Sequence, residues 1–101
     1  MNKEEKLRKL KLLKKELKKE GFIIDGIVGS FIDSNRFNDI NIVYHLNERF
    51  INKYKGWNAF IKLEEIKSLL KKNLESDIDL IDRDYTNNIM KKVIQNRMLS
   101  V

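Results

Sequence analysis

The sequence predicts an α/β (α+β) domain in which a small mixed β-sheet is backed by helices packed on one face. Two observations support this fold class and its organisation as a single domain. Amphipathic stretches with helical spacing alternate along the chain with short stretches rich in β-branched and apolar residues. The 101 residues also contain no proline and only 4 glycines, so no flexible linker is visible and residues 1–101 are predicted to form a single domain.

The first half of the chain predicts one helix and two strands. Residues 3–20 have the spacing of an amphipathic helix, which Gly21 would end. Its apolar face would consist of Leu7, Leu10, Leu13 and Leu17. Residues 22–28 are rich in β-branched and apolar side chains and predict a strand. After a polar connection over residues 29–38, apolar and polar side chains alternate along residues 39–46, which predicts a second strand.

The second half predicts two helices with a strand between them. Residues 47–57 are ambiguous and allow a short helix. Residues 58–75 have an apolar helical face, and Asn58 is positioned to cap that helix. Residues 77–82 predict a third strand. A last helix follows, opened by one of two capping candidates, Asp84 or Thr86.

The net charge of +6 is concentrated near the N-terminus, where residues 1–20 contain nine Lys or Arg and four Glu. A basic arm that binds nucleic acid is one interpretation. The solvated face of the amphipathic helix is preferred, because no aromatic residue is interleaved with the lysines to stack on bases.

Several classes of site and location are excluded by composition. The chain has no cysteine, which excludes disulfides and thiolate metal sites. No apolar run approaches the roughly 18 residues that span a bilayer. Charged residues begin at position 3, before any apolar segment of a signal peptide. We therefore expect a cytoplasmic protein with no membrane partner.

Three polar residues are predicted to meet at the sheet. Asp39 and Asn41 are two positions apart in one strand, so they point to the same face. Asp79 lies between apolar neighbours in the third strand, where a charged side chain needs a partner or a role. Holding Mg²⁺ ions for phosphoryl or nucleotidyl transfer is such a role. Gly29 and Ser30 would then supply backbone N–H groups and a hydroxyl for a triphosphate.

Each of these residues also has an ordinary structural interpretation. Ser30 could be a turn residue, Asp39 could cap a loop, and Asp79 could belong to an ion pair. All three at these positions by chance is much rarer than any one of them. His45, the only histidine, lies on the Asn41 face and is a weaker candidate for the site.

Four further residues receive structural interpretations. Asp77 and Asp82 flank the third strand and are predicted to be solvated. Trp57 and Phe60 are predicted to be core or interface anchors rather than a pair that stacks on a nucleotide.

The order of these motifs resembles that of the minimal nucleotidyltransferase (MNT) family, in the polymerase-β-like nucleotidyltransferase superfamily. In that family an apolar strand precedes Gly-Ser, a short loop, Asp-apolar-Asp on the next strand, and a third carboxylate on a later strand. Gly29-Ser30, Asp39 and Ile78-Asp79-Leu80-Ile81 match this pattern, and the resemblance covers nearly the whole chain. It implies a nucleotidyltransferase fold.

Two features depart from the family pattern. Asn41 stands where the family has its second Asp, and it offers a neutral carbonyl oxygen instead of a carboxylate. The family loop Gly-Ser-x-Ala-Arg-Gly is replaced here by Gly-Ser-Phe-Ile-Asp-Ser at residues 29–34. Arg36, at a displaced position, is the candidate substitute for the family arginine.

The resemblance implies Mg²⁺ and ATP as cofactors. The implied metal ligands are Asp39, Asn41 and Asp79, of which Asp39 and Asp79 would be catalytic. The implied nucleotide-binding residues are Gly29, Ser30 and Arg36. MNT proteins commonly act as antitoxins that neutralise a helical HEPN toxin, and some transfer AMP from ATP to a tyrosine of that toxin.

Three functions therefore stay open on the sequence, and whether the protein is an enzyme stays open with them. The first is an MNT-type antitoxin with AMP-transfer chemistry. The second is an MNT-fold antitoxin that has lost catalysis and acts by binding its toxin. The third is a small basic module that binds nucleic acid. Nucleic acid is less favoured as a partner than a HEPN protein or ATP. Homo- or hetero-oligomers are compatible with each.

Overall fold

The computed structural model describes residues 1–34 and 39–101. Within them the helices are α1 (Lys3–Lys18), α2 (Ser30–Asp33), α3 (Glu48–Lys53), α4 (Trp57–Leu74) and α5 (Asn88–Arg97). The strands are β1 (Phe22–Val28), β2 (Asp39–Leu46), β3 (Asp77–Asp82) and β4 (Leu99–Ser100). The predicted bounds of the first three strands agree with the structure, whereas α2 and β4 are additions. None of the helices that the structure describes has the length and apolarity to cross a membrane.

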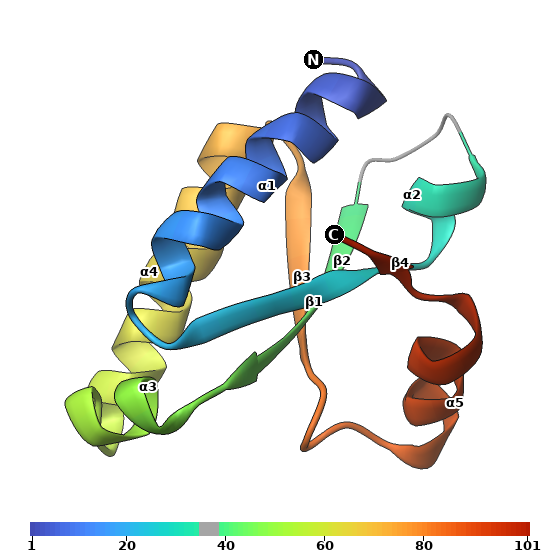
Figure 1. The fold of residues 1–101 in the computed structure, drawn as a ribbon. Helices are drawn as coiled ribbons and strands as arrows, with labels where there is room; N and C mark the ends of the chain where they lie inside the picture. Colours follow the sequence, from blue (N-terminus) through green and yellow to red (C-terminus); the bar gives the residue numbers. More distant parts are fainter. Residues whose placement is uncertain (35–38) are drawn as a thin grey trace.

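The strands form one mixed sheet in the order β3-β2-β1-β4. β1 runs antiparallel to both β2 and β4, and β2 runs parallel to β3. A parallel pair needs a crossover, and here α3 and α4 make it (Figure 1). The mixed α/β fold class is therefore confirmed, and the short β4 extends the sheet beside β1.

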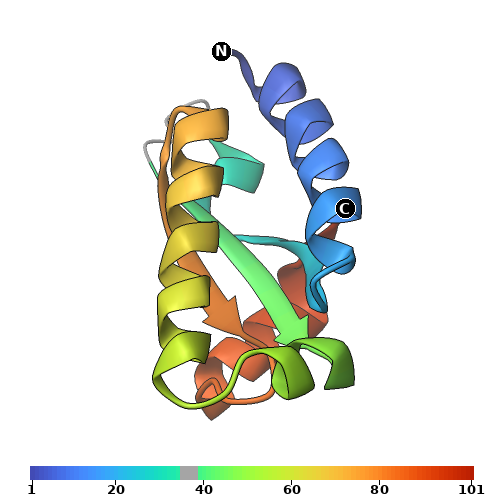
Figure 2. The same cartoon turned by 90° about the vertical axis from the view of Figure 1, so that its left-hand side faces the viewer.

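α1 and α4 lie side by side over one face of the sheet (Figure 2). They follow from the amphipathic patterns, because their apolar stripes pack on the β-branched residues of the strands. The core between these layers includes Leu10, Leu17, Ile24, Ile40, Ile42, Ile66, Leu70, Leu74 and Ile78. This is the helical layer that the sequence predicts.

α5 makes a smaller cover over the middle of the opposite face. Its Ile94 packs with Val28 of β1 and Val43 of β2, and Ile81 of β3 packs against this cluster. The prediction of helices on one face therefore holds for α1 and α4. It is incomplete for α5, which forms a second, partial layer on the opposite face. The remainder of this opposite face is referred to below as the open face.

The start of α5 differs from the prediction. Neither Asp84 nor Thr86 caps the helix; the side chain of Asn87 accepts a hydrogen bond from the Met90 N–H at 2.8 Å. The backbone N–H of Asp84 instead donates to the Asp82 side chain at 2.9 Å, which forms a separate turn after β3. Two polar turns therefore precede the helix, and the later one provides its cap.

The predicted cap of α4 is also wrong by two positions. Gly56, with φ of 57°, precedes Trp57, so Asn58 lies inside the first turn of the helix. The ambiguous segment before it forms α3, where the Asn47 side chain accepts hydrogen bonds from the N–H groups of Arg49 and Phe50. Glycine replaces a side-chain cap at α4 because the chain turns there with positive φ.

The solvated-face interpretation of α1 needs a correction for three of its lysines. Lys6 is buried and donates to the hydroxyl of Ser76, between α4 and β3. Lys3 donates to the Ile32 carbonyl at 2.8 Å, and Lys14 donates to a backbone carbonyl beyond β4. These hydrogen bonds hold α1 against other parts of the fold. The methylene chain of a lysine can pack on apolar surface while its ammonium group donates to a polar atom.

Candidate functional site

The register between β2 and β3 brings four polar residues together on the open face. Asn41 is the partner of Asp79, and Asp39 is the partner of Asp77, one step along the same two strands. Parallel strands lie about 4.8 Å apart, and every second residue shares a face. Asp39, Asp77 and Asp79 are exposed and Asn41 is half-buried. We refer to Asp39, Asn41 and Asp79, with the turn at Gly29, as the Asn41 site.

Gly29 holds the turn against Asn41. Its backbone has φ of 92° and ψ of −160°, a conformation almost confined to glycine. A Cβ at this position would lie 2.7 Å from the amide nitrogen of Asn41, well inside van der Waals contact. Val28, the preceding residue, is the β-sheet partner of Asn41. Ser30, which begins α2, is exposed beside this turn.

Asp77 is exposed, in agreement with its predicted solvation, but its position in the register was not predicted. It lies opposite Asp39, and its carboxylate is 3.3 Å from the ammonium group of Lys71. In the described residues, Asp39 and Asp79 make no ion pair. Within the described residues, both carboxylates of the site are therefore open to a ligand.

The donor set suits one hard cation better than two. Asp39 and Asp79 offer carboxylates, and Asn41 offers a neutral amide oxygen. Across residues 1–34 and 39–101, no three Asp, Glu, His or Cys side chains are arranged to hold a metal ion. Mg²⁺ is commonly held by one or two carboxylates together with substrate phosphates. The residues thus fit a Mg²⁺ ion that is bound with a nucleotide, and a second ion would lack an anionic ligand from position 41.

Five of the predicted site residues are thus neighbours in the structure: Gly29, Ser30, Asp39, Asn41 and Asp79. Arg36 lies outside the described residues, and its role stays a prediction. The roles assigned to the five in metal and nucleotide binding also stay predictions.

A second polar cluster lies at the other end of the open face. His45 Nδ1 is 2.8 Å from one carboxylate oxygen of Asp25, and the Arg83 guanidinium is 3.6 Å from the other. Asp25 is only 12% exposed and lies where the β1–β2 pairing is irregular. Val43 and Ile81, under α5, separate this cluster from the Asn41 site. His45 is therefore not a ligand of the Asn41 site.

The sequence around Asp25 also indicates a polar cluster, which the motif pattern alone does not single out. Like Asp79, Asp25 is a carboxylate inside an apolar strand, and such a group needs a partner. Its partners, His45 and Arg83, are distant in sequence, so only the fold reveals them.

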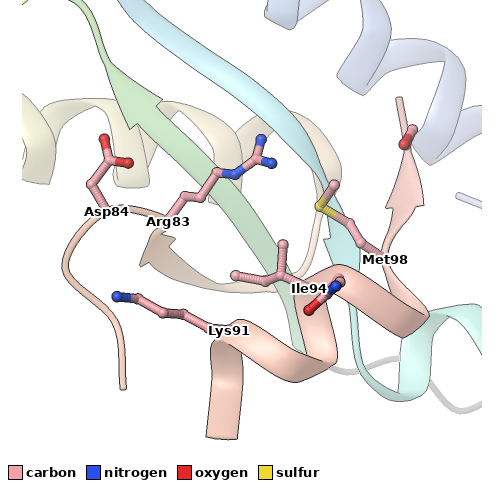
Figure 3. Close-up of a pocket in the computed structure, with 7 residues that line it drawn as sticks. Arg83, Asp84, Lys91, Ile94 and Met98 are labelled. Atoms are coloured by element: carbon pink, nitrogen blue, oxygen red, sulfur yellow. The ribbon is translucent and has the colours of Figure 1, made fainter. Parts of the chain in front are cut away.

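An open hollow of about 670 Å³ lies beside α5, lined by Arg83, Asp84, Lys91, Ile94, Gln95, Met98 and Ser100 (Figure 3). Figure 3 shows the Arg83 and Lys91 side chains extending in different directions. Arg83 is paired with Asp25, so the hollow has no pair of converging cations to select a phosphate. It is separate from the predicted nucleotide site.

No family model and no curated protein match the sequence. Two solved structures do match the fold. One is a mutant of the toxin–antitoxin MntA–HepT, with a TM-score of 0.60 and 19% sequence identity over 85% of this chain. The other is the toxin–antitoxin MntA–HepT itself, with a TM-score of 0.55 and 19% identity over 87% of this chain. The protein has the fold of these toxin–antitoxin chains.

The similarity covers 65% and 63% of the two matched chains, so this chain spans less than two thirds of their length. The shared part includes most of the present sequence. It agrees with the resemblance to minimal nucleotidyltransferases that the motifs indicate, and it confirms the predicted fold class.

Proposed function

We propose that this protein is an antitoxin with a nucleotidyltransferase fold, which neutralises a helical HEPN toxin by forming a complex with it and has weak or no AMP-transfer activity. One observation carries the proposal. Asn41 occupies the centre of the site, paired with Asp79, one step from Asp39 and against Gly29. This arrangement is the one that a nucleotide site would use, with a neutral ligand at its centre.

The remaining residues are suited to hold a nucleotide. Gly29 and Ser30 would place a backbone N–H group and a hydroxyl beside the phosphates. Asp39 and Asp79 would hold a Mg²⁺ ion that is bound with ATP, and such an ion stabilises negative charge on the transferred phosphate. The attacking hydroxyl then depends on position 41 for an anionic neighbour. An amide oxygen provides less stabilisation of positive charge there than a carboxylate does.

Support for a toxin partner comes from the fold. Both similar structures are of a toxin–antitoxin. Binding does not require the ligand that Asn41 replaces, so neutralisation can persist when catalysis is lost. The proposal therefore places partner binding first and AMP transfer second.

Coexpression with a HEPN protein, where a neighbouring gene encodes one, tests both parts. We expect the two chains to copurify, with little or no added AMP on the toxin after incubation with ATP and Mg²⁺, as measured by intact mass. Asn41→Asp should raise the rate of transfer by roughly two to three orders of magnitude, because an anionic ligand contributes a few kcal/mol to transition-state stabilisation.

Asp79→Ala and Asp84→Asn are the comparison variants. Asp84 is exposed and lies outside the Asn41 site, so Asp84→Asn should behave as wild type. Robust wild-type transfer that disappears in Asp79→Ala would show that catalysis is intact. Absence of a complex, with toxicity unchanged, would refute the antitoxin role.

A further inference from the structure

The first turn of α1 contacts the helix that follows the Gly29 turn. The ammonium group of Lys3 donates to the carbonyl of Ile32 at 2.8 Å, and it lies 5.2 Å from the centroid of the Phe31 ring. Phe31 and Ile32 belong to α2, which begins at Ser30, directly after Gly29. A residue of α1 therefore touches the segment that carries part of the Asn41 site.

α2 has little that would hold it in place by itself. It is four residues long, and its backbone hydrogen bonds include Ile32 N–H to the Gly29 carbonyl at 3.2 Å and Ser34 N–H to the Ser30 carbonyl at 3.0 Å. No side chain caps its start, and its last turn has no basic residue. A single helical turn is unstable alone, because its few hydrogen bonds do not offset the lost backbone entropy. The position of α2 thus depends on contacts with other elements.

Lys3 supplies what the end of α2 lacks. The last carbonyl groups of a helix have no partner within the helix, and positive charge is favourable beside them. Lys3 donates to one of these groups and brings an ammonium charge from α1. Phe31 is only 1% exposed in the core, and the same ammonium group lies over its ring, where a cation is attracted.

Lys3 itself projects from a turn that is held in place. The side chain of Asn2 caps α1 by accepting a hydrogen bond from the Glu5 N–H at 2.8 Å. One turn later, the buried Lys6 donates to Ser76. A capped and anchored turn frays less than a free helix end, so the Lys3 ammonium group has a fixed origin.

We propose that Lys3 is a positioning residue of the Asn41 site, which acts through α2 to hold the turn at Gly29 and Ser30 in the orientation that receives phosphate groups. The proposal rests on the nucleotide-binding role given to this site under the proposed function. Ser30 is the first residue of α2, so a shift of α2 moves the hydroxyl and the backbone N–H groups beside it. A displacement of about 1 Å at such groups can cost about a hundredfold in rate.

Lys6 is not expected to have the same effect on the site. Its partner Ser76 precedes β3, where Asp79 is placed by a parallel register of six residue pairs with β2. This pairing holds Asp79 with or without the hydrogen bond at Ser76. α2 has no strand pairing, so the loss of one contact matters more there.

The turn offers its own spectroscopic reporters. The amide protons of Ile32 and Ser34 close α2, and the side-chain amide of Asn41 lies against Gly29. NMR follows the hydrogen exchange of the first two and the chemical shifts of the third in the protein without nucleotide. These signals report on the turn whether or not ATP binds.

Tryptophan fluorescence does not report on this turn. Trp57, the only tryptophan, is 72% exposed at the start of α4, and its ring stacks on that of Phe60, which is 51% exposed. Neither is a core residue, so the core interpretation of this aromatic pair is wrong, and its role at an interface stays a prediction.

Lys3→Met removes the donor and keeps most of the side-chain length. We expect the exchange of the Ile32 and Ser34 amides to become about tenfold faster and the Asn41 side-chain signals to shift. We expect the affinity for ATP with Mg²⁺, measured by calorimetry, to fall about tenfold. A hydrogen bond from a charged group is worth at least such a factor. Lys3→Arg keeps a charged donor and should restore all three properties.

Lys14→Met is the matched control. Lys14 is another half-buried lysine of α1, and it also donates to a backbone carbonyl, that of Val101 beyond β4. Its replacement should leave the α2 amides, the Asn41 signals and the ATP affinity as in wild type. A general loosening of α1 would affect both variants, whereas a positioning role affects only Lys3→Met. Thermal unfolding confirms that each variant is folded.

The outcomes separate this proposal from the proposed function. Unchanged exchange of the α2 amides in Lys3→Met, equal changes in Lys14→Met, or no restoration by Lys3→Arg would overturn the positioning role. Equal ATP affinity in wild type and Lys3→Met would overturn it as well and leave the nucleotide site intact. A wild-type protein that binds no ATP would refute the nucleotide-binding role on which the proposal rests, even where amide exchange shows that Lys3 holds α2. Complex formation with the toxin is measured independently of both.

Discussion

At the scale of single residues, the Asn41 site depends on a pair of residues from adjacent strands. Gly29 has a backbone conformation that side chains other than glycine rarely adopt, and its missing Cβ leaves room for the Asn41 amide. Two effects therefore constrain position 29, one from the backbone and one from the neighbouring side chain. They can be separated because only the second depends on Asn41.

Gly29→Ala should lower the free energy of unfolding by about 1–3 kcal/mol from backbone strain, with a further loss from the clash with Asn41. In the double variant, Asn41→Ala should recover the stability that the clash removes, while the loss from backbone strain at position 29 remains. Urea unfolding of the two single variants and the double variant measures this coupling. Strictly additive effects would show that the Cβ and the amide do not meet.

Tyr44 is a buried titratable residue on the opposite face of β2. Its ring stacks on Phe22 with centroids 4.5 Å apart. Burial, and to a lesser extent the negative charge of Asp82, raise the pKa of Tyr44 from 10.0 to about 12. Since the folded pKa is above the unfolded one, the folded state binds the phenolic proton more tightly between these values.

We expect the stabilising contribution of the neutral Tyr44 to be fully present below pH 10 and to be lost as the pH rises from 10 to about 12. A difference of two pKa units corresponds to about 2–3 kcal/mol. Tyr44→Phe should remove this part of the alkaline destabilisation. The free energy of unfolding is measured with denaturant for wild type and Tyr44→Phe, at pH 9 and at pH of about 12. Parallel losses in the two proteins would assign the effect to other groups.

At the scale of elements, α1 is held by polar contacts as well as by its leucines. Lys6 is buried and reaches Ser76 at the junction of α4 and β3, and Lys3 reaches the end of α2. A buried ammonium group is tolerated only when it is hydrogen-bonded, because its desolvation is unfavourable. The charge of α1 is thus partly a structural feature of the fold.

Lys6→Ala should lower the free energy of unfolding by about 1–3 kcal/mol, since it removes a buried hydrogen bond to Ser76 and packed methylene groups, although the Ser76 hydroxyl still donates to the Leu74 carbonyl. Lys6→Met should lower it less, because it retains the volume and removes the desolvated charge. Lys11→Ala, at an exposed position on α1, should change stability by less than about 0.5 kcal/mol. Equal effects at positions 6 and 11 would contradict a specific role for Lys6.

The elements that could be predicted are those with strong local patterns. β1, β2 and β3 have β-branched and alternating residues, and α1 and α4 have long apolar stripes. α2 and β4 were missed because four and two residues are too short to show a period. The cap of α5 was misplaced because several polar residues compete in the segment after β3, where Asp82 accepts from the Asp84 N–H in one turn and Asn87 caps the helix after it.

The candidate site could be predicted only in part. Alternation along β2 places Asp39 and Asn41 on one face without any knowledge of the fold. The pairing of Asn41 with Asp79 depends on the parallel register of two strands joined by a long helical crossover, which no local pattern defines. The Asp25–His45–Arg83 cluster likewise depends on the irregular β1–β2 pairing and on the sheet order.

At the scale of the whole molecule, the positive charge has two different uses. Part of the charge on α1 is engaged in contacts with Ile32, Ser76 and the backbone beyond β4. Another part forms ion pairs near α3 and the start of α4, where Lys53 is paired with Glu20 and Lys62 with Glu65. These five lysines are engaged within the fold, which leaves less of the net charge of +6 for a nucleic acid.

We expect nucleic-acid binding to be weak and to collapse between low and physiological salt, because contacts of lysine with phosphate depend on counterion release. Fluorescence anisotropy with a labelled RNA and a labelled DNA duplex, between about 0.05 and 0.2 M salt, measures this. Tight binding that persists at the higher salt would revive the nucleic-acid module as the function.

β3 is an outer strand of the sheet, and it carries Asp77, Asp79 and Asp82. An outer strand has unpaired N–H and C=O groups that invite pairing with another molecule, and charged side chains oppose such aggregation. The carboxylates of β3 therefore act as protection against self-assembly in addition to any role toward a ligand. Variants that neutralise them, such as Asp79→Ala, should aggregate more readily on storage or heating. Loss of activity in such a variant is interpretable only when light scattering shows that the protein has stayed monodisperse.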